Sequence, residues 1–183
     1  GNTYGHDDDV SSDVSDDQAD KIPKKGGARI VEMLQAIRNG DVEAFEKEAS
    51  CGYSDTDGYY QYSENSSWEM LLPIIMRAQN IDISARTSMV NIVLQNSEDP
   101  QTQVRQPYKG HVTSLSHAIK SGWVDIAITL ITHGADIHEM CACDKKHTPI
   151  KNAIAQSNIT ARDSARLVKA LKNAGARLDG EFL

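Results

Sequence analysis

The chain has 183 residues, of which 25% are charged and 5% aromatic, an ordinary composition for a globular protein. Its net charge of -7 lies wholly in residues 1–20, which contain seven aspartates and neither lysine nor arginine, so residues 21–183 hold 19 acidic and 19 basic residues. A neutral body lacks the positive field that nucleic-acid or anionic-membrane binding needs, so we expect neither a nucleic-acid nor a membrane partner.

The acidic segment is the first predicted element of the chain. Residues 1–27 are predicted to form an acidic, disordered N-terminal tail because large apolar side chains are scarce there. A segment that docks through its aspartates is the alternative. No signal peptide and no long apolar run is recognisable, and the three cysteines, Cys51, Cys141 and Cys143, are too few for a disulfide framework. A reducing compartment suits such a chain, so we expect a cytoplasmic location.

Two helices are predicted next. Ile30, Met33, Leu34 and Ile37 form an apolar stripe at helical spacing, which Asn39, Gly40 and Asp41 interrupt. A second helix is predicted from Val42 to Cys51 and Gly52. An extended finger over residues 53–66 follows, with Asp57 and Gly58 as a plausible hairpin turn.

The second unit is less regular. Ser66, Ser67, Trp68 and Glu69 have the pattern of a capping box, which predicts that a helix begins there. Pro73 would then lie inside that helix, so either the helix begins later or it is distorted. Residues 84–94 are predicted to form its second helix, and residues 95–110 are a polar stretch before the next unit.

Residues 113–139 form the clearest unit. Two short helices are predicted, one ending at Gly122 and one closed by a left-handed residue at Gly134. Their apolar faces are Leu115, Ala118 and Ile119 in the first helix and Ile126, Ala127, Leu130 and Ile131 in the second. Two such helices cannot bury these faces alone and need neighbours of the same kind.

This unit resembles an ankyrin repeat, whose pattern runs T-P-L-H-x-A, then Gly, then L-L-x-x-G-A-D-V-N. The matching residues are Thr113, Leu115, Ala118, Gly122, Leu130, Gly134, Ala135 and Asp136, whereas Ser114 replaces Pro and Ser116 replaces His. A second copy begins at Thr148, Pro149 and Ile150 and ends at Gly175 and Ala176, with extra residues around 157–161 and a final helix capped near Thr160.

The resemblance implies an all-α ankyrin-repeat solenoid of about four repeats over residues 28–183, with stacked helix pairs and extended finger loops. It also implies a monomeric protein–protein interaction module that binds a partner protein or peptide through its concave face and fingers. The residues expected to contact that partner are Tyr59, Tyr60, Tyr62, Tyr108, Ser116, Lys120, His138, Met140, Lys151 and Asn152. Trp123 is expected to pack between repeats.

Two alternatives remain at this point. The chain could be a targeting or regulatory ankyrin module of a larger enzyme, or of a pathogen effector that acts in host cytosol. It could also bind metal through His138, Cys141, Cys143 and His147, although the Cys-Ala-Cys spacing is not the usual zinc knuckle. No phosphate loop, dinucleotide fingerprint or nucleophile elbow is present, so we expect no enzymatic activity and no cofactor.

Overall fold

The structure, a computed structural model, describes residues 26–51, 60–61, 68–69, 71–110, 112–138 and 148–178. Within these ranges the chain is mainly helical and contains four short strands, which confirms the predicted all-α class. In the same part of the chain, no helix is long and apolar enough to cross a membrane. The predicted tail, residues 1–27, falls almost entirely outside the described residues, and α1 begins at Gly26.

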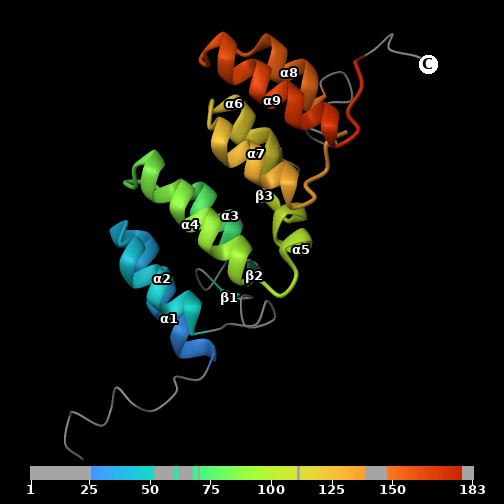
Figure 1. The fold of residues 1–183 in the computed structure, drawn as a ribbon. Coiled ribbons are helices and arrows are strands. Elements are labelled where there is room, and N and C mark those ends of the chain that lie inside the picture. Colours follow the sequence, from blue (N-terminus) through green and yellow to red (C-terminus); the bar gives the residue numbers. More distant parts are fainter. Residues whose placement is uncertain are drawn as a thin grey trace, which may run out of the picture.

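Eight of the described helices form four pairs that lie side by side in chain order (Figure 1). The first helix of each pair packs against the second, and the second helices contact one another in succession along the stack. A further short helix lies at the edge of the stack between the second and third pairs (Figure 1). The pairs are α1 (Gly26–Asn39) with α2 (Val42–Ser50), α3 (Leu71–Arg77) with α4 (Ile83–Asn96), α6 (Ser114–Lys120) with α7 (Val124–Thr132), and α8 (Pro149–Ala155) with α9 (Ala161–Asn173), while α5 is Pro100–Arg105.

Two small antiparallel ribbons precede first helices. Strands β1 (Tyr60–Gln61) and β2 (Trp68–Glu69) pair just before α3, and β3 (Pro107–Lys109) and β4 (Val112–Thr113) pair just before α6. Strand β4 runs directly into α6, because Thr113 is both its last residue and the N-cap of that helix.

Local capping signals explain where most of these helices begin. The side chains of Asp41, Asp82, Thr113, Thr148 and Thr160 each accept a hydrogen bond from a backbone N–H in the first turn of the helix that follows. Such caps satisfy N–H groups that have no partner inside the helix, and each is worth about 1 kcal/mol.

Left-handed glycines explain where several helices end. Gly122 (φ 74°) and Gly134 (φ 91°) close α6 and α7, as the sequence predicted. At both sites the following N–H donates back to the carbonyl five residues earlier, from Trp123 to Ala118 and from Ala135 to Leu130. This pairing satisfies the last helical carbonyls and turns the chain toward the next element.

The apolar faces predicted for the third pair form part of one continuous core. Leu115, Ala118, Ile126, Ala127 and Leu130 are all at most 1% exposed. The core extends from Ile30 and Met33 in α1 to Leu167 and Leu171 in α9, so each pair buries its apolar surface against its neighbours.

Two sequence predictions for the second unit were wrong or incomplete. The capping box at residues 66–69 does not start a helix, because Trp68 and Glu69 lie in β2 and α3 begins at Leu71. Pro73 therefore lies in the first turn of α3. A backbone N–H at this position has no acceptor inside the helix, so the proline removes no helical hydrogen bond. The polar stretch 95–110 contains α5, which Asp99 caps, and strand β3. The proposed turn at Asp57 and Gly58 lies outside the described residues.

Candidate interaction surface

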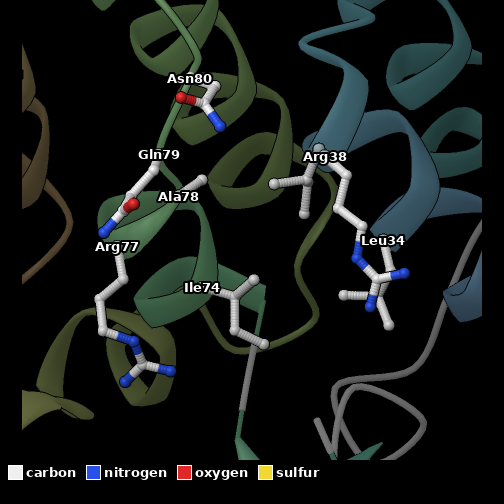
Figure 2. Close-up of a pocket in the computed structure, with 8 residues that line it drawn as sticks. Leu34, Arg38, Ile74, Arg77, Ala78, Gln79 and Asn80 are labelled. Carbon is white, nitrogen blue, oxygen red and sulfur yellow. The ribbon is translucent and has the colours of Figure 1, made fainter.

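A groove with a volume of about 490 Å³ lies between α1 and α3, the first helices of the first two pairs (Figure 2). The side chains of Leu34 and Arg38 extend from α1, and those of Ile74 and Arg77 extend from α3. The lining thus combines apolar side chains with two arginines, of which Arg77 extends away from the α1 wall. The complete lining is Leu34, Ile37, Arg38, Ile74, Arg77, Ala78, Gln79 and Asn80.

The helix faces explain why these side chains meet. In α1 the buried stripe of Ile30, Met33 and Ile37 turns toward the core, which leaves Leu34 half-buried and Arg38 exposed at its edge. In α3 every residue from Leu71 to Met76 is buried, so Arg77 is the first polar residue of that helix. The Nη1 group of Arg77 donates a hydrogen bond to the Tyr108 carbonyl at 2.7 Å, which ties the end of α3 to strand β3.

The chain leaves α3 through a tight turn that completes the groove. Gln79 and Asn80 are exposed there, and Asn80 has a left-handed backbone with φ of 64°. Asparagine is among the few non-glycine residues that tolerate this conformation. Asp82 then caps α4, its carboxylate accepting from the Ala85 N–H at 2.7 Å.

Charge is distributed unevenly between first and second helices. The first helices α1, α3, α6 and α8 contain five basic residues, Arg29, Arg38, Arg77, Lys120 and Lys151, and one acidic residue, Glu32. The second helices carry both signs, with acidic residues in α2, α7 and α9. The first helices therefore bring positive charge to a chain whose body is neutral as a whole.

The residues that were predicted from the sequence to contact a partner differ in how exposed they are. Lys120 is exposed in the last turn of α6, and Lys151 and Asn152 are half-buried on α8. His138 is exposed after α7, and its N–H donates to the Asp136 carboxylate at 2.9 Å. The prediction that Ser116 contacts the partner is wrong, because Ser116 is fully buried in α6 and its side chain is not available to a partner.

Three other residues expected to contact the partner, Tyr59, Tyr62 and Met140, lie outside the described residues, and Tyr60 belongs to strand β1. Their assignment to partner contact therefore stays a prediction.

Tyr108 belongs to a packed group rather than to an open surface. Its ring stacks on His117 with centroids 4.0 Å apart and planes 9° from parallel. His117 in turn meets Trp123 edge-on at 4.9 Å, and the guanidinium carbon of Arg86 lies 4.5 Å from the Trp123 ring centroid. We call these four residues the aromatic–arginine cluster. It joins α4 of the second pair to α6 and α7 of the third, so Trp123 packs between pairs as expected.

Arg86 also completes the end of α3. Its Nη1 donates to the carbonyls of Ile75 and Met76 at 2.6 and 3.0 Å, and its Nη2 donates to the Ala78 carbonyl at 2.8 Å. A buried arginine thus replaces the glycine-based ending that closes α6 and α7, and satisfies carbonyls that have no partner inside the helix. Burial lowers the pKa of Arg86. Burial, assisted by the charge of Arg86, also lowers the pKa of His117.

Three of the four residues suggested as metal ligands, Cys141, Cys143 and His147, lie outside the described residues. Among the residues that are described, no group of three or more His, Cys, Asp or Glu side chains is placed to hold a metal ion.

Comparison with known proteins finds no relative of this chain. No family model matches the chain, and no curated protein and no solved structure matches it either.

Sequence reasoning missed the arginines that give the surface its character. Arg38 and Arg77 were not singled out, although each follows a run of apolar residues in the last turn of its helix. That position is a usable signal, since a cation there is favoured by the helix dipole and lies at the rim of the buried face. Arg86 carried no comparable signal, because its partners are backbone carbonyls of another helix.

Proposed function

We propose that this chain is a non-catalytic, ankyrin-like interaction module that binds a segment of a partner protein across its first helices. The observation that carries the proposal is the groove between α1 and α3, whose lining combines apolar side chains with two arginines. Half of the eight lining residues are apolar and half are polar. Concave sites that combine apolar surface with placed polar groups are typical of binding sites.

The packing of the helix pairs supports the ankyrin-like part of the proposal. Each pair contacts its neighbours, the third and fourth first helices are capped by Thr113 and Thr148, and left-handed glycines follow α6, α7 and α9. These features agree with the repeat pattern in the sequence. Function is argued from the surface, however, because a shared fold alone does not imply a shared activity.

The charge of the first helices supports a partner segment with acidic residues. Complementary charge raises the rate of encounter and fixes orientation, even where each exposed pair adds little affinity. Lys120 and Lys151 add positive charge on the first helices of the third and fourth pairs. A partner in extended or helical form could therefore contact several pairs at once.

The test compares three matched substitutions after a partner has been captured from lysate and purified. Arg38→Gln in α1 and Lys120→Gln in α6 each remove a last-turn cation from a first helix, and Lys47→Gln removes one from the second helix α2. All three side chains belong to exposed residues.

In a titration, each first-helix substitution should weaken binding by about two- to fivefold, the range for one exposed charge pair. Lys47→Gln should bind as the unmodified chain does. Equal effects at all three positions, or an effect at Lys47 alone, would place the partner elsewhere. Melting temperatures of the three variants should agree, so that a folding defect is not mistaken for lost contact.

A further inference from the structure

The C-terminal end of α3 is held by two side-chain contacts, and both lead to His117 on α6. Arg77 donates to the Tyr108 carbonyl at 2.7 Å, and the Tyr108 ring stacks on His117 with centroids 4.0 Å apart. In the other contact, Arg86 donates to carbonyls at the end of α3 and lies over Trp123, which meets His117 edge-on at 4.9 Å. His117 is therefore joined to the same helix end by two routes.

His117 is the member of the aromatic–arginine cluster that can change its charge near neutral pH. Its imidazole is half-buried, and its Nε2 lies 3.4 Å from the Ser121 hydroxyl oxygen of the same helix. Burial, and then the positive charge of Arg86, hold the pKa of His117 below its ordinary value of 6.5. The packed cluster therefore favours the neutral ring, because a proton would add a second positive charge to a cluster that already contains Arg86.

Several elements bring charged or titratable groups to α6. Strand β3 contributes the phenol ring of Tyr108, which stacks on His117, and α4 contributes Arg86. The other charged side chains described on α6 and on α5, α7 and α8, which pack against it, are Lys120, Arg105, Asp125 and Lys151. Arg105 and Asp125 form hydrogen bonds elsewhere. The charge that opposes a proton on His117 is that of Arg86.

We propose that His117 makes the end of α3 sensitive to pH: when it gains a proton, the aromatic–arginine cluster loosens and residues 78–80 are released from their two contacts. The last carbonyls of a helix have no partner inside it, and those of α3 accept from Arg86. Residues 78–80 line the groove between α1 and α3, so their release changes the shape of one wall (Figure 2). This response requires no partner and is independent of the proposed function.

Nuclear magnetic resonance on the full-length chain, between about pH 8 and about pH 5, follows the proton and its consequence together. The His117 ring reports its own titration, and the backbone amides of residues 75–80 report the end of α3. We expect both to shift with one midpoint below 6.5, while the amides of α9 stay unchanged. Amides of residues 75–80 that stay still while His117 titrates would overturn the proposal. So would a His117 midpoint above 6.5, because the cluster would then favour the proton.

Two matched substitutions assign the response to one histidine. His117→Gln removes the titrating ring, and His133→Gln removes another half-buried histidine of the third pair, whose Nδ1 lies 2.8 Å from the Thr129 carbonyl. The pH-dependent shifts at residues 75–80 should disappear in His117→Gln and persist in His133→Gln. Shifts that persist in His117→Gln would show that another group titrates and would contradict the proposal.

Hydrogen exchange separates release of the helix end from a purely electrostatic change in the resonances. The Ala78 N–H donates to the Ile74 carbonyl at 2.8 Å, and the Ala176 N–H, after α9, donates to the Leu171 carbonyl at 2.9 Å. After correction for the pH dependence of intrinsic exchange, protection of Ala78 should fall by about three- to tenfold as His117 is protonated, because the released state binds the proton more tightly. Protection of Ala176 should stay constant. Equal changes at both amides, or none at Ala78, would show that α3 is not released and would refute the proposal.

Discussion

Replacing Arg86 with methionine should destabilise the fold, because Arg86 closes α3 from a different helix. Methionine keeps most of the length and apolar surface of the arginine stem but cannot donate a hydrogen bond. The substitution would leave the carbonyls of Ile75, Met76 and Ala78 without their present donors. It would also remove the positive charge above Trp123.

The magnitude follows from balancing these losses against one gain. Each buried carbonyl left without a partner costs about 1–3 kcal/mol, and the cation–π contact with Trp123 adds about 0.5–2 kcal/mol. Removing a buried charge recovers part of this, since Arg86 is only 7% exposed and its desolvation is costly. We expect a net loss of about 2–4 kcal/mol in the free energy of unfolding, which lowers the melting temperature by about 5–15 °C.

Chemical denaturation followed by circular dichroism measures this loss. Arg162→Met, on the exposed face of α9, is the matched control and should change the unfolding free energy by less than about 0.5 kcal/mol. Arg86→Lys should fall between the two, because it keeps the charge but cannot reach three carbonyls with a planar group. If Arg86→Met is as stable as the control, the carbonyls find other donors and the assigned role of Arg86 is wrong.

Three further predictions concern the third pair. Leu130→Ala should cost about 2–5 kcal/mol in denaturant unfolding, because Leu130 is fully buried between neighbouring helices, and an unshifted transition would refute that placement. Gly122→Ala should lower the melting temperature, because φ is 74° and the new Cβ would lie 3.1 Å from the Asn158 side chain; Gly175→Ala, also left-handed (φ 102°) but with open space around it, should lower it less. Stability should fall as the pH drops below about 6.5, because the lowered pKa of His117 means that the unfolded chain binds this proton more readily than the folded one. His117→Gln should flatten that part of the pH profile, and an identical slope in the variant would show that another group titrates.

The third and fourth pairs could be predicted because their signals are local. Thr113, Gly122 and Gly134 act on residues within one turn, so a cap or a left-handed glycine indicates a helix boundary without knowledge of the fold. The same local reasoning failed at residues 66–69, where the capping-box pattern was overruled by pairing with β1. A short strand pair depends on a partner elsewhere in the chain, and no pattern within the four residues reveals it.

The candidate surface was less predictable because it depends on contacts between distant segments. Ser116 stands on the first helix of its pair at the place of a repeat-pattern histidine, yet α6 turns it into the interior. Arg77 becomes part of a surface only because α1 and α3 leave a groove between them. Such an arrangement follows from the relative position of two helix pairs, which periodicity along the chain does not encode.

Helix α5 and strand β3 separate α3 from α6, since both first helices contact this insertion. The joint between the second and third pairs therefore depends on α4 packing against α7 and on the aromatic–arginine cluster. In a linear array, cooperativity is transmitted only through the interfaces between neighbours. Loss of both contacts should therefore uncouple the first two pairs from the last two, so that the backbone amides of the two blocks exchange with solvent at two distinct rates.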